Sequence, residues 1–295
     1  MSGQGLCGRG IDPQALPRSA ALTDLLLGGA GHGAGGGVDR EGLARELERH
    51  LCSARLPQRV RVTGYLLRTV LGPPRPPTPW RPLSPFRWSP AAVRRAVGLR
   101  GVRSCVEAGG GAPATAVRGT VEELVAEGRR GLGRPGGLPT WLSTLATPAL
   151  AVVEAEAATW ATQLWSAIEW PRLGADVQVG DADAAWVAPA ARVRVSGRVD
   201  VRVPRPVGGP ALLTMLPGHP TVVSRAELGL AALAAALGGR PPRGGGGALP
   251  ALVVGWWPES GRALALPVDG ALLEETAGAV ARVVTSMAGT SLADR

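Results

Sequence analysis

The alternation of hydrophobic and polar residues predicts several β-strands in the second half of the chain. The strictest pattern is RVRVSGRVDVRVP (192–204), in which valines occupy odd positions and polar residues occupy even ones. A period of two is typical of a strand with one buried face, so we expect one strand here. The apolar runs 211–216, 251–257 and 263–268 predict buried strands, the last two joined as a hairpin.

Helical spacing and capping signals predict the helices. Leu43, Leu47 and Leu51 repeat every four residues, which indicates a helix from Asp39 to about Ser53. Ser89 followed by a proline predicts the start of another helix. The remaining expected helices are 117–130, 148–169 with Trp160 and Trp165 facing inward, 224–237 opened by a capping box of Ser224 and Glu227, and 270–287. Residues 59–71 fit either a strand or a helix.

Composition divides the chain into three regions. Residues 1–38 are rich in glycine and are expected to form a flexible leader. Residues 39–85 are expected to form an N-terminal helical segment and a basic connector, because seven prolines within 72–85 exclude a helix or a central strand. Residues 86–295 are expected to form the main domain, of α/β (α+β) class with a mixed central sheet flanked by helices.

The overall composition excludes several kinds of protein. The chain has 295 residues, of which 45% are hydrophobic and 19% charged, so it can form a substantial core. It contains no lysine, which excludes a lysine Schiff base or general base. Three scattered cysteines offer neither a disulfide framework nor a zinc motif, and no apolar run is long enough for a membrane span. We therefore expect a cytoplasmic protein with no membrane partner, no resident metal and no small-molecule cofactor.

Positive charge is concentrated between Arg55 and Arg134. This span holds fifteen arginines and four acidic residues, a formal charge of +11, whereas the whole chain carries +9. Such a region is suited to phosphate contacts, and nearby tryptophans can stack on unpaired bases. The predicted nucleic-acid-binding residues are Arg59, Arg61, Arg68, Arg75, Arg81, Arg87, Arg94, Arg95, Arg100, Arg103, Trp80 and Trp88. An acidic protein partner would also fit a proline- and arginine-rich segment.

From about residue 83 to 287, the order of motifs resembles the RecB-like branch of the PD-(D/E)XK nuclease superfamily. LSPFRWSP (83–90) is similar to the opening Ser-Pro before a helix, and RGTVEEL (118–124) to a helical motif that contains a metal-binding histidine. VSGRVDVRV (195–203) is similar to the G-x-I-D strand, LLTMLPG (212–218) to the D/E-x-K strand, and RAELGLAAL (225–233) to the helix that follows. The resemblance implies a PD-(D/E)XK nuclease-like core.

The residues that the resemblance would make catalytic are mostly replaced. In the family, carboxylates hold a divalent metal and a lysine activates water. Asp200 is retained, but Thr214 and Leu216 occupy the positions of the second carboxylate and the lysine. The remaining substitutions are Glu122 or Glu123 for the histidine, Glu227 for the glutamine and Ala231 for the tyrosine. Asp200 also fits a simple ion pair with Arg198 and Arg202, its neighbours on the same strand face.

These observations predict a catalytically inactive nuclease-fold protein. It would bind DNA or act as a scaffold, together with a partner protein, in a complex for DNA repair, recombination or antiviral defence. One alternative is a structural protein–protein interaction subunit that contacts no nucleic acid. Another is a DNA nuclease that uses Mg²⁺ or Mn²⁺ and the remnant candidates Asp200, Glu122, Glu123 and Glu227.

Overall fold

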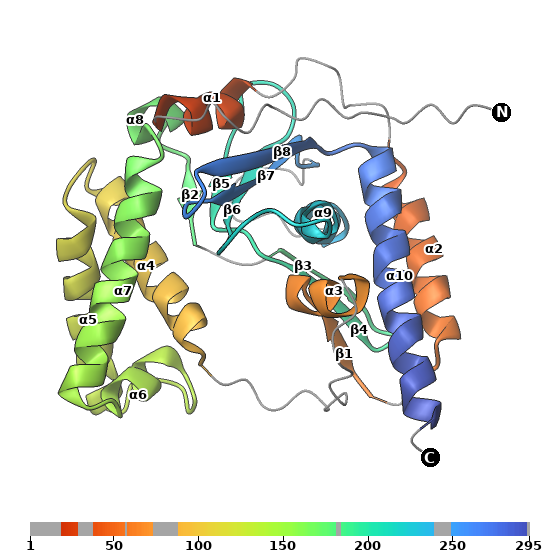
Figure 1. Cartoon of the computed structure of the whole chain (residues 1–295), viewed down its shortest axis with the longest axis horizontal. Helices are drawn as coiled ribbons and strands as arrows, with labels where there is room; N and C mark the ends of the chain where they lie inside the picture. Colours follow the sequence, from red (N-terminus) through yellow and green to blue (C-terminus); the bar gives the residue numbers. More distant parts are fainter. Residues whose placement is uncertain are drawn as a thin grey trace.

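The structure, a computed structural model, describes residues 19–28, 38–56, 58–72, 88–180, 184–238 and 249–293 (Figure 1). The helices are α1 Ser19–Gly28, α2 Arg40–Ser53, α3 Gly64–Leu71, α4 Pro90–Glu107, α5 Pro113–Arg129, α6 Leu138–Ser143, α7 Thr147–Ser166, α8 Trp170–Leu173, α9 Ser224–Leu237 and α10 Gly270–Ala293. The strands are β1 Val60–Val62, β2 Gln178–Val179, β3 Ala184–Ala188, β4 Val193–Gly197, β5 Val201–Val203, β6 Ala211–Met215, β7 Leu252–Trp257 and β8 Arg262–Pro267.

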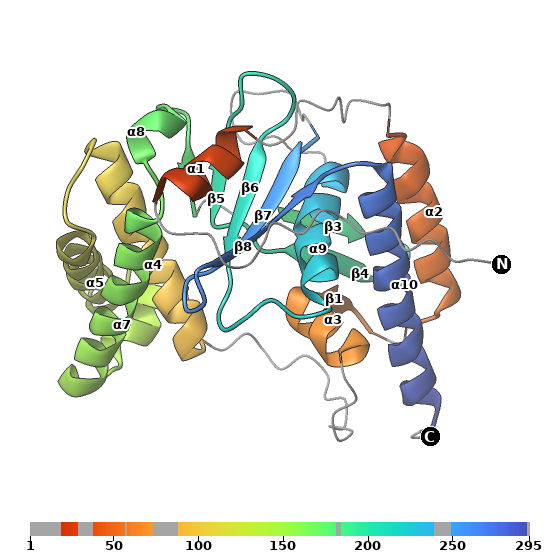
Figure 2. The same cartoon turned by 45° about the horizontal axis from the view of Figure 1, so that its top comes forward.

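A five-stranded sheet in the order β2-β5-β6-β7-β8 lies between two layers of helices (Figures 1 and 2). Alternate residues of β6 face opposite layers, as the period of two requires. Leu213 and Met215 belong to the apolar cluster formed with α4, α5 and α7, whereas Leu212 belongs to the cluster formed with α9 and α10. β6 is buried on both of its faces, which explains its nearly continuous apolar run.

The order of the strands agrees with the predicted mixed α/β class. β6 and β7 are parallel and are connected through α9, and β7 and β8 form the expected antiparallel hairpin. β2, β5 and β6 are antiparallel neighbours. The sheet is therefore mixed, and it places the ends of β5 and β6 beside α4 and α7.

The prediction of one strand over 192–204 is wrong, because its two halves belong to two different sheets. β4 pairs with β1 and β3 in a separate three-stranded sheet, while β5 belongs to the five-stranded sheet. The chain bends between them because Gly197 packs on α9, where an added Cβ would lie 2.2 Å from the Cα of Ala231. After the bend, the amide of Asp200 donates to the carbonyl of Leu213 at 2.8 Å and starts the new pairing.

The N-terminal segment packs directly against the main domain. Val60 of β1 is in register with Val193 of β4, and the two strands are parallel. α2 and α3 both contact α10. The ambiguous segment 59–71 thus contains a strand followed by a helix, and residues 39–72 share one core with the strands of the main domain.

Part of the expected flexible leader forms a helix. Leu22 and Leu26 of α1 are buried in the cluster that contains α4 and α7. The hydroxyl of Thr23 accepts a hydrogen bond of 2.9 Å from the amide of Glu169. The prediction of flexibility is therefore wrong for residues 19–28. Most of the proline-rich connector, residues 73–87, lies outside the described residues.

Three helices begin where predicted, at Arg40, Pro90 and Ser224, but only the first two have the predicted side-chain cap. Asp39 accepts from the amide of Gly42, and Ser89 accepts from the amide of Ala92. No side chain caps α9, because the hydroxyl of Ser224 accepts from the amide of Thr221 and Glu227 pairs elsewhere. The predicted capping box is therefore wrong.

The two tryptophans of α7 differ in burial. Trp160 is buried as predicted, while Trp165 is partly buried and stacks on Trp170 with ring centroids 5.2 Å apart.

Within the described ranges, none of the helices combines the length and apolarity that a membrane crossing needs.

Candidate functional site

Asp200 is the centre of a buried charge cluster between the two sheets and α4. It lies in the connection between β4 and β5, and its side chain is completely inaccessible to solvent. Its Oδ1 accepts hydrogen bonds from the Nε of Arg95 and, at 3.3 Å, from the Nε of Arg198. Its Oδ2 accepts from the amide of Met215 at 2.6 Å. Both carboxylate oxygens are thus occupied by donors from the protein.

The surroundings of Asp200 favour its charged form. Burial alone raises the pKa of a carboxyl group. The positive charges of Arg198 and Arg95 and the hydrogen bonds from Arg95 and Met215 outweigh burial, so the pKa of Asp200 is held below its ordinary value. The aspartate is an internal anion whose counter-charges are arginines.

The sequence predicted only one of the two arginines that neutralise Asp200. Arg198 was expected as a neighbour, and it forms the pair. Arg95 comes from α4, 105 residues earlier in the chain, and its Nη2 also donates to the carbonyl of Val199 at 2.9 Å. Arg202, the other expected neighbour, forms no ion pair with Asp200 among the described residues. Burial instead lowers the pKa of Arg202.

The positions that the resemblance compares with catalytic residues have structural surroundings. Thr214 is buried, and its hydroxyl donates to the carbonyl of Arg198 at 2.6 Å. Leu216 is also buried. The backbone of Ala231 lies against Gly197, where an added Cβ would meet it. These residues stabilise the bend between β4 and β5, and none of them supplies a metal ligand or a base.

Glu227 forms a second ion pair close to the first. Both of its oxygens accept from Nη1 of Arg68 on α3, at 2.6 and 2.8 Å. Burial raises the pKa of Glu227, although the charges of Arg68 and Arg198 act in the opposite direction. Because Arg198 interacts with both acids, the side chains form a chain of alternating charge from Arg68 to Arg95.

The candidate acids do not form a magnesium site. Glu122 and Glu123 are exposed on α5, whereas Asp200 is completely buried and pairs with Arg95, and Glu227 pairs with Arg68. Within the described ranges, no cluster of three or more His, Cys, Asp or Glu side chains has metal-binding geometry. Mg²⁺ is bound by carboxylate oxygens, whereas Oδ1 of Asp200 accepts from two guanidinium groups and Oδ2 accepts from the amide of Met215. The donor set does not fit the metal that the resemblance implies.

Several arginines of the basic segment are neutralised by acids from outside it. Arg94 pairs with Glu156 at 3.8 Å, and Arg118 pairs with Glu154 at 3.0 Å. Arg103 faces inward and donates twice to the carbonyl of Val179, at 2.8 and 2.6 Å. Fewer positive charges of this segment are therefore available to a ligand than the sequence alone suggested.

The other predicted binding residues are distributed over different surfaces. Arg100 is exposed on α4, and the indole of Trp88 donates to the carbonyl of Gly136 at 3.0 Å. Arg75, Arg81, Arg87 and Trp80 lie outside the described residues. Among the residues that the structure describes, the predicted binding side chains therefore do not form one continuous surface.

One group of arginines does share a surface. Arg61 of β1 is in register with Arg194 of β4, and both are exposed on the outer face of the three-stranded sheet. Arg59, just before β1, is exposed as well. The Nε of Arg61 donates to the hydroxyl of Ser196 at 3.2 Å, which orients it along β4. We call Arg59, Arg61 and Arg194 the basic sheet face; Arg194 is the member that sequence reasoning missed.

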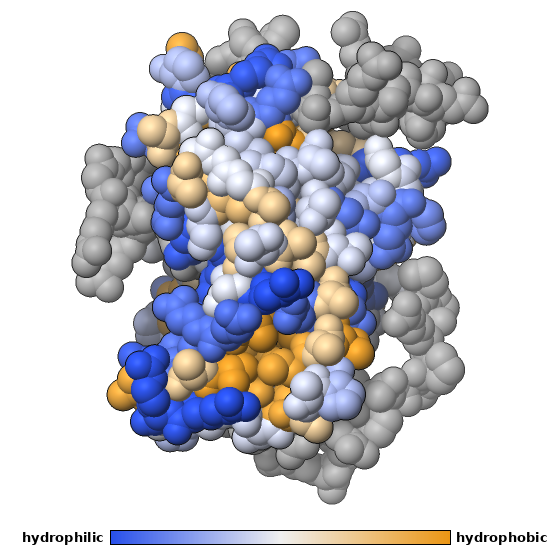
Figure 3. All heavy atoms as spheres, turned by 90° about the vertical axis from the view of Figure 1, so that its left-hand side faces the viewer, coloured by the Kyte–Doolittle hydropathy of each residue, from blue (hydrophilic) through white to orange (hydrophobic). Residues whose placement is uncertain are grey.

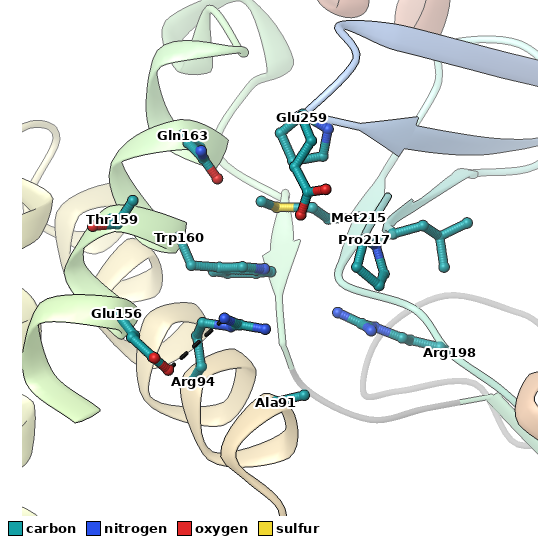
Figure 4. A pocket seen from close by; sticks show the side chains of 12 residues that line it. Ala91, Arg94, Glu156, Thr159, Trp160, Gln163, Arg198, Met215, Pro217 and Glu259 are labelled. Carbon is teal, nitrogen blue, oxygen red and sulfur yellow. Dashed lines mark ion pairs between the residues drawn. The ribbon is translucent and has the colours of Figure 1, made fainter. Parts of the chain in front are cut away.

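A cavity of about 280 Å³ opens next to Asp200, between α4, α7 and the ends of β6 and β7 (Figure 4). Arg94 and Arg198 extend into it from opposite walls. Trp160, Met215 and Glu259 lie between and above them in this view.

A different surface, formed by α5, α6 and α7, is partly apolar. Figure 3 shows this side of the molecule, with apolar side chains gathered beside charged ones. Leu132 and Val152, which belong to this part of the chain, are 67% and 57% exposed.

Comparison with protein-family models, with curated proteins and with solved structures finds no match to the chain.

Proposed function

We propose that this protein binds nucleic acid without cleaving it, on a nuclease-like core whose metal site is replaced by a cluster of arginines. The observation that carries the proposal is the full burial of Asp200 between Arg95 and Arg198. The order α4, β5, β6, α9 and β7 supports a PD-(D/E)XK-like arrangement, in which this aspartate would hold a metal.

The chemistry of the cluster opposes hydrolysis. Two guanidinium groups beside the carboxylate repel a divalent cation. Thr214 and Leu216 provide neither a second carboxylate nor a group that can activate water. The same positive charges favour a phosphate group, because arginine donates several hydrogen bonds in a fixed plane.

The basic sheet face is the proposed contact with the phosphate backbone. Arg61 and Arg194 occupy adjacent positions on neighbouring strands, where their like charges repel each other. A polyanion laid across the sheet would relieve this repulsion. Backbone contacts of this kind give affinity that decreases steeply with salt and depends little on base sequence.

The experiment is a salt series of fluorescence anisotropy with labelled single- and double-stranded DNA. We expect binding that weakens with salt, and we expect Arg61→Gln with Arg194→Gln to reduce the slope against log salt by about 2. The matched control is Arg129→Gln with Arg130→Gln, which removes the same charge from the exposed end of α5. No binding at low salt overturns the proposal, and equal slopes for the two double variants overturn the assignment of the face.

A scaffolding function is the second candidate. It is favoured by the exposed side chains of Leu132, which follows α5, and Val152 on α7. The double variant Leu132→Asp with Val152→Asp should lose assembly with a partner and keep DNA binding unchanged. Loss of DNA binding in that variant would assign this surface to the nucleic acid instead.

A further inference from the structure

We propose that the cavity between α4, α7 and β6 holds one unpaired nucleotide, with a preference for a base that carries an amino group. This inference rests on the proposed function, since it assigns a part of the nucleic acid to a particular site. Its ligand class follows from how the polar and apolar side chains are distributed in the cavity.

The guanidinium groups of Arg94 and Arg198 form one end of the cavity (Figure 4). Arg94 is bound only loosely by Glu156, at 3.8 Å, and both side chains are accessible to solvent. Arg198 is held in position by Asp200 through its Nε. Two guanidinium groups that approach from opposite walls suit a phosphate group, which accepts hydrogen bonds on several oxygens.

The opposite end presents hydrogen-bond acceptors. In Figure 4 the carboxylate of Glu259 and the amide of Gln163 point into the cavity from above. Glu259 is fixed by the amide of Gly218, which donates to its Oε2 at 3.1 Å. A carboxylate accepts from the exocyclic amino group of cytosine or adenine and repels the carbonyl that thymine has instead.

Apolar side chains connect the two ends. Trp160 and Met215 lie between the arginines and Glu259, and Pro217 and Pro258 complete this part of the wall. A base is flat and apolar on its faces and polar at its edge, so it fits between such groups. The volume of about 280 Å³ is near the lower end of the range for small-molecule sites and suits a ligand of the size of one nucleotide.

The different chemistry of its two ends explains why both acids and arginines line the cavity. Glu156 is paired with Arg94, so Glu259 is the acid that lies apart from the arginines. A simple anion would be repelled by Glu259, and a simple cation by Arg94 and Arg198. A nucleotide carries a phosphate acceptor at one end and amino donors at the other, which matches the cavity at both ends.

The experiment compares labelled oligo(dC) and oligo(dT) binding to the whole chain. One additional hydrogen bond corresponds to about fivefold in affinity, so we expect oligo(dC) to bind about fivefold more tightly. Glu259→Gln, which keeps the acceptor for Gly218, should bring the ratio close to one. Arg94→Gln should weaken both ligands by the same factor, and by more than Arg282→Gln, a control on the exposed side of α10.

Two results would overturn the inference. These are equal affinity of the wild type for the two oligonucleotides, and an Arg94→Gln effect no larger than that of Arg282→Gln. If DNA binds in either case, the proposed function is unaffected.

Calorimetry with free deoxycytidine monophosphate and thymidine monophosphate tests whether the cavity binds a free nucleotide as well as one within DNA. Binding of the free nucleotide, lost in Arg94→Gln, without any binding of DNA would support the cavity and overturn the proposed function.

Discussion

Arg95 of α4 and Asp200 of the β4–β5 connection form an ion pair that joins the helical layer to the bend between the two sheets. The aspartate is fully buried, and the arginine side chain is only 21% exposed. A buried carboxylate needs such a partner, because an uncompensated charge in the interior is strongly destabilising. Asp200 thus has a structural role that does not require a metal.

Removing Arg95 should destabilise the protein much more than removing its neighbour. We expect Arg95→Met to lower the free energy of unfolding by about 3 kcal/mol, since Asp200 stays buried with one counter-charge fewer. Arg94→Met breaks only a solvent-accessible pair and should cost less than about 1 kcal/mol. Urea unfolding of the two variants provides the measurement. Similar losses would contradict a structural role for the Arg95–Asp200 pair.

Asp200 should stabilise the fold above its unfolded-state pKa. Because its pKa is lowered in the folded protein, the native state binds fewer protons than the unfolded state as the pH falls below about 4. Its contribution is therefore complete above that pH and is lost as the pH falls through the folded pKa. Urea midpoints measured for the wild type and Asp200→Asn should converge in acid. A difference that does not shrink in acid would contradict this.

Glu227 should make the stability of the fold change with pH in the opposite direction to Asp200. Its pKa is raised by burial, so the native state binds more protons than the unfolded state and stability decreases as the pH rises through the folded pKa. The stability of Glu227→Gln relative to the wild type should increase from about pH 4.5 toward neutrality. A difference that is constant or decreases over this range would show that Arg68 and Arg198 outweigh burial.

Gly197 and Gly119 should respond in opposite ways to alanine. An added Cβ at Gly197 would meet the backbone of Ala231, so Gly197→Ala should cost about 2–3 kcal/mol. Gly119 lies on α5 with open space around it, so Gly119→Ala should stabilise by about 0.5–1 kcal/mol. Thermal unfolding compares the two variants. An unchanged melting temperature for Gly197→Ala would contradict the close packing of β4 on α9.

Local signals in the sequence predicted much of the fold. Asp39 and Ser89 act as helix caps within a few residues of their targets, so the starts of α2 and α4 follow from the sequence. The valines of 192–204 are buried as their alternation predicts. The predicted hairpin of β7 and β8 is also present, because its strands are adjacent in the chain.

The features that were missed depend on distant residues. The break between β4 and β5 requires Ala231 against Gly197 and Leu213 opposite Asp200, and no local pattern contains both. The pairs of Asp200 with Arg95 and of Glu227 with Arg68 span more than a hundred residues each. Helix α1 was missed because glycine-rich sequence surrounds Leu22 and Leu26, which are stabilised by packing.

The two described cysteines should differ in reactivity. Cys52 is exposed on α2, while Cys105 is buried on α4 and burial raises the pKa of its thiol. In a Cys7→Ser background, a thiol-reactive dye should modify Cys52 rapidly and Cys105 only on unfolding. Rapid modification of both thiols in the folded protein would contradict the packing of α4.

The most direct test of the account measures binding and cleavage in the same sample. Labelled DNA is incubated with the wild type and with Asp200→Asn in Mg²⁺ or Mn²⁺, and both the bound fraction and the length of the DNA are recorded. The account predicts that the wild type retains the DNA at full length, with or without metal. Metal-dependent shortening by the wild type that Asp200→Asn abolishes would contradict it.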